Sequence, residues 1–82
     1  MVARVSGKAD DGRLLARLGD AIRTRRLALG LSQEALADAA GIDRSHMGKI
    51  ERGERNVTML NLVRVADALQ RSPSEIMQAA GL

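Results

Sequence analysis

The sequence predicts an all-α fold of five helices, on three observations. Apolar residues recur three or four positions apart through most of the chain, which is the period of a helix with one buried face. Ser, Thr or Asp stands as a potential N-cap before four of these stretches, and Gly follows four of them as a stop signal. No stretch shows the strict alternation of a half-buried strand. With 82 residues, the chain is long enough for one domain with one core.

The first helix is predicted to begin at Leu14. Residues 1–12 show no sustained period, so we expect them to form a flexible N-terminal arm that precedes a folded domain over 13–82. From Leu14 onward one stripe of the helix is apolar, and Gly30 is placed as a C-terminal cap. The residues of this stripe are Leu15, Leu18, Ile22 and Leu29.

Two short helices follow with a very short connection between them. Ser32 is a good N-cap for a helix over 33–40, and Asp43 is a good N-cap for a helix over 44–52. Only about three residues, beginning with Gly41, join these helices. A tight connection of this kind is typical of a helix-turn-helix, in which the first helix braces the second.

Capping signals also predict the last two helices. Thr58 can cap a fourth helix that extends to about Leu69. The tetrapeptide Ser72-Pro73-Ser74-Glu75 combines an N-cap, a proline at the first helical position and a capping box, and Gly81 ends this fifth helix.

Composition limits the classes of partner. Thirteen basic and ten acidic residues give a net charge of +3, but residues 31–56 hold four basic and five acidic side chains. Phe, Tyr and Trp are absent, so the stacking platforms of single-stranded nucleic-acid binders are missing, and duplex DNA is the favoured nucleic acid. Cys is absent, and we find neither a signal-peptide pattern nor the ~20 apolar residues of a membrane span. We therefore expect a cytoplasmic, nucleoid-associated protein with no membrane partner.

The third predicted helix has an outer face of hydrogen-bond donors. Met47 and Ile50 point inward, and the residues that point away from them are Arg44, Ser45, Gly48, Lys49 and Arg52. Such side chains can bind base edges in a major groove, whereas the alternative is an ordinary solvated face. A glycine inside a helix costs about 1 kcal/mol relative to alanine, so Gly48 favours close approach of another backbone or a base.

Three runs resemble the Cro and phage-repressor type of helix-turn-helix, which implies a five-helix, lambda-repressor-like fold. They are Leu31 to Ala37 (LSQEALA), Gly41 to Ser45 (GIDRS) and Ile50 to Asn56 (IERGERN). The segment DRS…GKIERGERN most resembles controller proteins of restriction-modification systems, and the resemblance covers about residues 14–78.

The resemblance implies a role for each matching position. Arg44, Ser45 and Lys49 would face base edges. The residues that would contact phosphates or lie near the DNA backbone are Gln33, His46, Arg52, Arg55 and Asn56. The chain departs from relatives at Val57, where proline is common, and at His46, where controllers usually carry tyrosine.

Two opposite charges lie where burial is expected. Arg26 follows Ile22 by four positions on the first apolar stripe, and Glu51 follows Met47 by four on the third helix. The resemblance implies that they pair between these helices, and the alternative is that both side chains reach water.

No residue set predicts a metal site, a cofactor or catalysis. His46 is the only histidine and has no Cys beside it, so a metal would need carboxylates alone. Ser45 and His46 are adjacent on a helix and point about 100° apart, which does not make a nucleophile and base. We therefore expect no enzyme, and we find no feature of a small-molecule site.

The fourth helix is apolar over more than one stripe, which predicts a homodimer. We expect Met59, Leu62, Ala66 and Leu69 to fill the core. A candidate dimer patch remains, made of Leu60, Val63, Met77, Ala80 and Leu82. The alternatives are a small exposed patch or a core that wraps further around the helix.

The predicted function is sequence-specific binding of double-stranded DNA by a homodimeric transcription regulator on a palindromic operator. Two recognition helices about 34 Å apart would read successive major grooves. A restriction-modification controller is the favoured role, and an antitoxin or phage-type repressor is the alternative. RNA polymerase is a candidate further partner. An alternative of another class is a protein-interaction module with this fold and no DNA binding, against which the basic residues of 44–55 argue.

Overall fold

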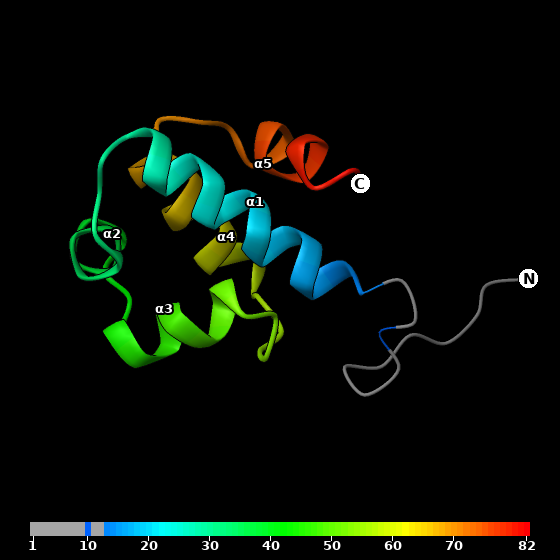
Figure 1. Cartoon of the computed structure of the whole chain (residues 1–82), viewed down its shortest axis with the longest axis horizontal. Helices are drawn as coiled ribbons and strands as arrows, with labels where there is room; N and C mark the ends of the chain where they lie inside the picture. The colour runs from blue at the N-terminus through cyan, green and yellow to red at the C-terminus, as the bar shows by residue number, and fades with distance from the viewer. Residues whose placement is uncertain (1–9, 11–12) are drawn as a thin grey trace, which may run out of the picture.

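Five helices make up the described part of the protein. The computed structural model describes Asp10 and residues 13–82, and no strand occurs among them. The helices are α1 (Leu14–Ala28), α2 (Gln33–Ala40), α3 (Arg44–Glu51), α4 (Met59–Ala68) and α5 (Pro73–Ala79) (Figure 1). The all-α prediction is therefore confirmed, whereas the predicted arm lies outside the described residues except for Asp10.

The predicted side-chain caps begin four of the helices. The Ser32 hydroxyl accepts a hydrogen bond from the Ala35 N–H at 3.0 Å, and Thr58 accepts one from Asn61 at 3.1 Å. The Asp43 carboxylate accepts from the first amides of α3. Ser72 forms the predicted capping box at the start of α5. Cap chemistry acts within three or four residues, so sequence alone could predict these starts.

Helix α1 begins differently. Its N-cap, Arg13, has a left-handed backbone with a φ of 53° and makes no side-chain cap hydrogen bond. The carboxylate of Asp10 takes that role, because it accepts hydrogen bonds from the N–H groups of Leu14 at 2.7 Å and Leu15 at 2.9 Å. This cap was not predicted, because Asp10 belongs to the segment that was expected to form the flexible arm.

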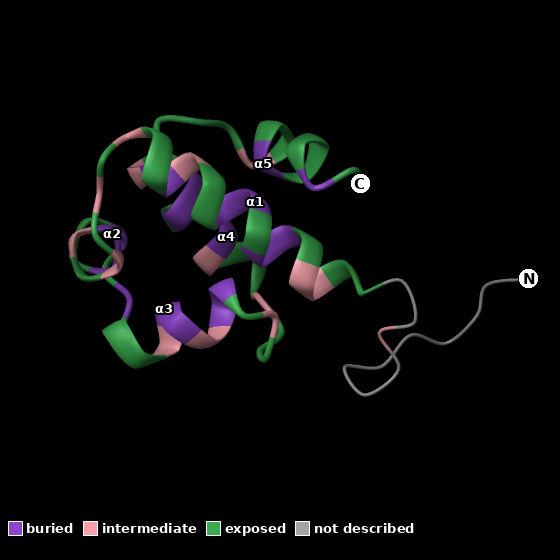
Figure 2. Ribbon diagram, in the orientation of Figure 1, coloured by how far each residue is buried: buried purple, intermediate pink, exposed green. Residues whose placement is uncertain are grey.

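The core lies where the inner faces of the helices meet. Helix α1 packs against α3 on one side and α5 on the other, α2 packs against α3 and α4, and α4 packs against α5. Buried residues line the facing sides of the helices (Figure 2). The fully buried large side chains are Ile22, Leu36, Met47, Ile50, Val65, Leu69 and Ile76. Helix α3 packs against α1 and α2 on its inner side, and its other side is exposed.

Two predictions about burial are wrong. Met59 was expected in the core but is 70 % exposed, because the buried stripe of α4 consists of Leu62, Val65 and Ala66 and its first residue lies beyond the packed neighbours. Ala80 was expected in the dimer patch but is only 7 % exposed. It follows the last residue of α5, which packs against α1, and its carbonyl accepts a hydrogen bond from Arg17 Nε at 3.0 Å.

Helices α1 and α3 approach each other closely at glycines. A Cβ atom on Gly19 would lie 2.5 Å from the carbonyl oxygen of Ile50 and even closer to that of Glu51. A Cβ atom on Gly53 would lie 2.6 Å from the Cα of Ala16, and its φ of +72° is itself unfavourable for other residues. These glycines let α1 lie against the C-terminal end of α3, which fixes the tilt of that helix.

Candidate nucleic-acid interface

The outer face of α3 presents the predicted donors. Met47 and Ile50 are 0 % and 1 % exposed, so the inner side of the helix is packed into the core. Arg44, Ser45 and Arg52 are exposed on the other side, and Lys49 is half-buried. An open hollow, which we call the reading hollow, is lined by Gln33, Arg44, Ser45, Gly48, Lys49 and Arg52. The structure thus brings the three predicted base-reading residues together with two of the predicted phosphate-contacting residues.

Gly48 forms part of the reading hollow. A Cβ atom at this position would lie 3.1 Å from Arg52 Nη1 and 3.3 Å from Gln33 Oε1. Both neighbours are tips of flexible side chains, so the fold of the chain itself does not require glycine here. Within the chain, the close approach predicted for Gly48 is therefore to side chains and not to a backbone, and the approach of a base stays a prediction.

The remaining predicted phosphate contacts lie on α3 and in the loop that follows it. His46 is half-buried on α3, and Arg55 and Asn56 are exposed in the loop that follows it. This loop follows Gly53, which packs against α1, so its first residues are held close to the end of α3. His46 therefore lies on α3 itself and the other two lie in the loop that follows it, and contact of all three with phosphate stays a prediction.

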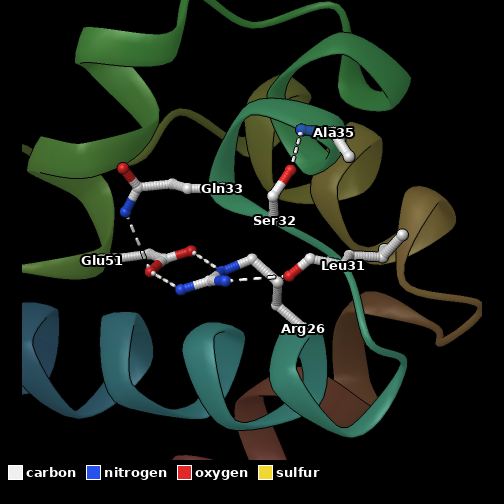
Figure 3. Close-up of polar contacts among 6 residues, drawn as sticks. All are labelled: Arg26, Leu31, Ser32, Gln33, Ala35 and Glu51. Atoms are coloured by element: carbon white, nitrogen blue, oxygen red, sulfur yellow. Dashed lines mark hydrogen bonds and ion pairs between the residues drawn. The ribbon is translucent and has the colours of Figure 1, made fainter.

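A buried ion pair joins α3 to α1. Arg26 Nε lies 2.8 Å from Glu51 Oε2, and Arg26 Nη2 lies 3.1 Å from Glu51 Oε1 (Figure 3). The two side chains are 10 % and 3 % exposed. Arg26 Nη1 also donates to the carbonyl of Leu31 at 2.9 Å. The predicted pairing is confirmed, and burial argues against the alternative of two charges that reach water.

Gln33 connects this ion pair to the reading hollow. Its Nε2 donates a hydrogen bond to Glu51 Oε1 at 3.1 Å (Figure 3), a contact that the sequence did not predict. An amide nitrogen carries two N–H groups, so one donor remains for a phosphate. The side chain at the start of α2 is therefore held in place by the same carboxylate that binds Arg26.

Carboxylates also lie among the exposed donors. Arg44 Nη1 lies 3.8 Å from Glu34 Oε2, and Arg52 Nε donates to Glu54 Oε2 at 3.2 Å. The hydrogen bond from Arg52 lowers the pKa of Glu54 below its ordinary value. No sequence pattern singled out either glutamate as a partner, because the rotamers of exposed side chains decide these contacts.

The Ser45 hydroxyl is engaged as well. It donates to the Asp43 carboxylate, and this hydrogen bond, together with those from the backbone N–H groups of His46 and Ser45, lowers the pKa of Asp43. Asp43 thus caps α3 as an ionised group at neutral pH, and the same carboxylate holds the Ser45 hydroxyl.

Several large apolar residues of α4 and α5 are exposed. Leu60 is 58 % exposed and Val63 is 44 % exposed, while Met77 and Leu82 are 37 % and 46 % exposed. Met59, wrongly assigned to the core, joins this set. We call Met59, Leu60, Val63, Met77 and Leu82 the α4–α5 apolar residues. Four members of the predicted dimer patch are therefore available to a partner, and Ala80 is not.

Two further observations concern metal ligands and membrane-spanning helices in the described chain. Among residues 13–82 and Asp10, no three His, Cys, Asp or Glu side chains come together as metal ligands. No helix in this part of the protein has the length and apolar character needed to cross a membrane.

Comparison with known proteins places the chain in a family. Residues 22–76, which include α2, α3 and α4, match the helix-turn-helix family. The chain belongs to the helix-turn-helix family. It is 40 % identical over 65 residues to control protein C.SmaI of Serratia marcescens, an alignment that covers 79 % of this chain and 77 % of that protein. It is 37 % identical over 60 residues to the phage CTXphi transcriptional repressor RstR of Vibrio cholerae, but these span only 54 % of that protein.

Solved structures of controller proteins have the same fold. The restriction-modification controller protein C.AhdI of Aeromonas hydrophila superposes with a TM-score of 0.74 at 47 % identity, over 76 % of this chain and 94 % of that one. The controller protein C.Esp1396I, crystallised as a tetramer in complex with its natural 35 base-pair operator, superposes with a TM-score of 0.75 at 31 % identity. That alignment covers 82 % of this chain and 88 % of the other. The five-helix, lambda-repressor-like prediction is thereby confirmed.

Proposed function

We propose that this protein is a sequence-specific, double-stranded DNA-binding transcription regulator of the restriction-modification controller type. The observation that carries the proposal is the donor face of α3, anchored by a buried ion pair, in a chain similar to controller proteins over most of its length. A regulator of this kind acts where its operator lies, at the nucleoid in the cytoplasm.

The recognition step assigns a role to each element. Helix α3 enters the major groove, where Arg44 and Lys49 donate to guanine O6 and N7 and Ser45 serves as a hydrogen-bond partner for either base type. Gln33, His46, Arg52, Arg55 and Asn56 flank this face and contact phosphates, which fixes the register of the protein on the duplex. The Arg26–Glu51 pair keeps α3 at a fixed angle to α1.

Two copies of the chain would read one operator. The α4–α5 apolar residues supply the surface through which the copies associate. The recognition helices then lie in successive major grooves about 34 Å apart, so the operator is a palindrome. The fraction of dimer rises with protein concentration, which makes operator occupancy a measure of how much protein the cell has produced.

We propose no enzymatic activity for the chain. The Ser45 hydroxyl is bonded to Asp43 and not to the adjacent His46, so these two residues do not form a nucleophile and base pair. We propose RNA polymerase as a further partner only for the case that the protein activates transcription. A transcription assay with purified components tests this, because binding of the protein to its operator should then increase transcription from the adjacent promoter.

Selection of DNA sites tests the proposal. Purified protein is mixed with duplexes that carry a random central region, and bound DNA is recovered and sequenced over several rounds. We expect enrichment of one two-fold symmetric sequence with half-sites about one helical turn apart. If no sequence is enriched, the chain does not bind DNA sequence-specifically, and the alternative of a protein-interaction module with this fold is favoured.

Substitutions on α3 identify the reading face. Arg44→Ala together with Lys49→Ala should reduce operator affinity by at least about 30-fold, because two base contacts are worth ~1–3 kcal/mol each and every ~1.4 kcal/mol is a factor of ten. Arg71→Ala, in the loop that precedes α5, removes an exposed charge away from α3 and should leave affinity unchanged. Retained affinity in the double variant would show that another face reads the DNA.

A phage-type repressor or an antitoxin is the second candidate role. The similarity to the repressor RstR favours the repressor alternative, although the match spans about half of that protein. Neighbouring genes distinguish these roles, because a controller gene adjoins endonuclease and methyltransferase genes and an antitoxin gene adjoins a toxin gene.

A further inference from the structure

An open groove lies beside the reading hollow, between α1 and the helix-turn-helix. Gln33 and Arg52 line both the groove and the reading hollow, so the two are adjacent. The Arg26–Glu51 pair also lines the groove, which we call the α1 groove. Its other polar residues belong to α1 and are Asp20 and Arg23.

Arg23 is the arginine of α1 for which the described structure shows no partner. Of the four arginines in α1, Arg17 and Arg25 donate to backbone carbonyls at the ends of α5 and α4, and Arg26 binds Glu51. Arg23 is exposed and forms no ion pair with a described residue. The packing of α1 therefore does not account for an arginine at this position.

The close contact of α1 with α3 determines where Arg23 lies. Arg23 precedes Arg26 by three positions, so the two side chains are neighbours on the surface of α1. Arg26 reaches Glu51 at the end of α3, and Gly19 lies against the backbone of the same helix end. Arg23 is thus on the flank of α1 that borders the helix-turn-helix, in the same groove as Arg52.

The charges of the α1 groove suit an anion. Arg26 neutralises Glu51, which leaves Arg23 and Arg52 as the cations of the groove. The exposed pair of Arg52 with Glu54 is weak and does not withhold Arg52 from a phosphate. Asp20 also lines a second hollow, between α1 and α5, so it lies at the edge of the α1 groove that faces away from α3.

We propose that Arg23 binds a backbone phosphate of duplex DNA in the α1 groove, which makes α1 a third DNA-contacting helix. The inference rests on the proposed function. With α3 in the major groove, the DNA backbone that borders it passes Gln33 and Arg52, and Arg23 meets the same strand further on. Arginine is well suited to this contact, because its planar fork of N–H groups matches the oxygens of a phosphate.

A phosphate contact carries no sequence information, so its loss affects every duplex alike. We expect Arg23→Gln to flatten the slope of log affinity against log salt by about 0.9 per bound copy, on a random duplex and on the selected operator. Over the roughly sevenfold range from 1 M to physiological salt, that slope amounts to a loss of about fivefold per copy. Arg23→Lys keeps the charge and should retain most of the wild-type slope.

Arg71→Gln is the matched control. Arg71 is likewise exposed, forms no ion pair with a described residue, and lines the hollow between α1 and α5. Figure 1 shows α5 on the opposite side of α1 from α3. The control therefore removes the same charge without a phosphate contact and should leave the slope unchanged. Urea denaturation should give equal midpoints for all variants, because neither arginine supports the fold.

Uncharged phosphates locate the contact on the DNA. Methylphosphonates are placed one at a time along one strand of the selected operator, and each duplex is titrated with wild-type protein and with Arg23→Gln. At one position in each half-site, the substitution should weaken the wild-type protein by about fivefold and leave the affinity of Arg23→Gln unchanged. At every other contacted phosphate, the two proteins should lose the same factor.

Four outcomes overturn the inference. They are an unchanged salt slope in Arg23→Gln, an equal change in Arg71→Gln, a loss confined to the operator, and the absence of any phosphate at which the two proteins differ. Failure of the proposed function looks different, because wild-type protein would then enrich no operator in the selection. The salt slope on random duplex needs no operator and still decides whether Arg23 contacts the backbone, and wild-type protein that binds no duplex at any salt overturns both.

Discussion

The ion pair between Arg26 and Glu51 puts two charges almost out of reach of water, with side chains 10 % and 3 % exposed. Each charge is tolerated because the other neutralises it and because Leu31 and Gln33 supply further hydrogen bonds. The pair therefore supports the packing of α3 against α1, and loss of one partner alone should destabilise the reading surface as well as the core.

Glu51→Gln is expected to lower the free energy of unfolding by about 3–5 kcal/mol, because it leaves the guanidinium of Arg26 buried without a counter-charge. Urea denaturation followed by circular dichroism measures the loss. The matched variant Arg26→Met with Glu51→Leu removes both charges and should recover most of that stability, since apolar replacements of buried pairs are often neutral. A loss below about 1 kcal/mol in Glu51→Gln would mean that water screens the pair.

Capping carboxylates make the fold sensitive to acid. The hydrogen bond from Ser45 lowers the pKa of Asp43 below 3.8, and the hydrogen bond from the Ser72 N–H lowers the pKa of Glu75 below 4.5. Both groups therefore bind protons less readily in the folded state than in the unfolded state. Their contribution to stability is present above these ordinary values and is lost as the pH falls through them toward the folded pKa values.

We expect the urea midpoint of wild-type protein to be level above about pH 5 and to fall progressively below it. Asp43→Asn together with Glu75→Gln keeps both caps but removes both titrations, so its midpoint should fall less steeply in acid. Identical acid dependence in the two proteins would show that other carboxylates dominate the loss.

At the scale of individual side chains, the one long-range contact that the sequence analysis anticipated joins two buried residues. Arg26 and Glu51 lie on inward stripes, and the family resemblance implied that these opposite charges pair, as the structure confirms. The partners of Gln33, Arg44 and Arg52 were not predicted, because several rotamers of a half-exposed side chain are close in energy and the tertiary structure selects one.

At the scale of helices, local chemistry set most boundaries. Four N-caps and the three-residue connection between α2 and α3 were predictable, since the interacting groups are near neighbours in sequence. The start of α1 was not predictable. The carboxylate that caps it belongs to Asp10, which lies before Arg13, a residue with a left-handed backbone, and accepts a hydrogen bond from the N–H of Leu14. The close contact of α1 with α3 was equally hidden, since Gly19 inside a helix gives no local sign of what approaches it.

Two helical glycines should therefore respond oppositely to alanine. Gly19→Ala drives a Cβ atom into the backbone of α3 and should destabilise the protein by about 1–3 kcal/mol. Gly48→Ala meets only side-chain tips and should leave stability unchanged or raise it by up to about 1 kcal/mol. The same alanine fills part of the reading hollow, so operator affinity should fall although the fold is intact. Urea denaturation and gel-shift titration of both variants check this, and equal stabilities would contradict it.

In the molecule as a whole, α1 holds the recognition helices and the C-terminal helices together. Arg25 Nε donates to the carbonyl of Leu69 at the end of α4 at 3.0 Å, and Arg17 Nη2 donates to the carbonyl of Gly81 beyond α5 at 2.7 Å. Figure 1 shows α3 and α5 on opposite sides of α1. The same helix thus fixes where a dimer surface on α4 and α5 would lie relative to α3.

Burial on α4 and α5 was the least predictable feature, because it depends on how far neighbouring helices extend. Met59 is on the inward stripe by spacing and yet is exposed, and Ala80 belongs by sequence to the outer set and yet is buried. The sequence correctly indicated surplus apolar surface, but only packing decides which residues form it.

The surplus surface leads to a prediction about assembly. Leu60→Glu together with Val63→Glu places two charges among exposed apolar residues of α4, where an interface would have to bury them without partners. We expect this variant to sediment as a folded monomer at concentrations where wild-type protein is a dimer. Its operator affinity should fall by about 100-fold or more, because a monomer loses the second half-site and the effective concentration that links the two.

Leu27→Glu provides the control for that variant, since Leu27 is 56 % exposed on α1 and belongs to neither α4 nor α5. It introduces the same residue type at a similar exposure and should change neither mass nor affinity. If the α4 variant stays dimeric while it retains operator affinity, the copies associate through another surface. If it becomes monomeric but binds as tightly as wild type, each recognition helix reads its site independently, and the occupancy of the operator no longer depends on dimer formation.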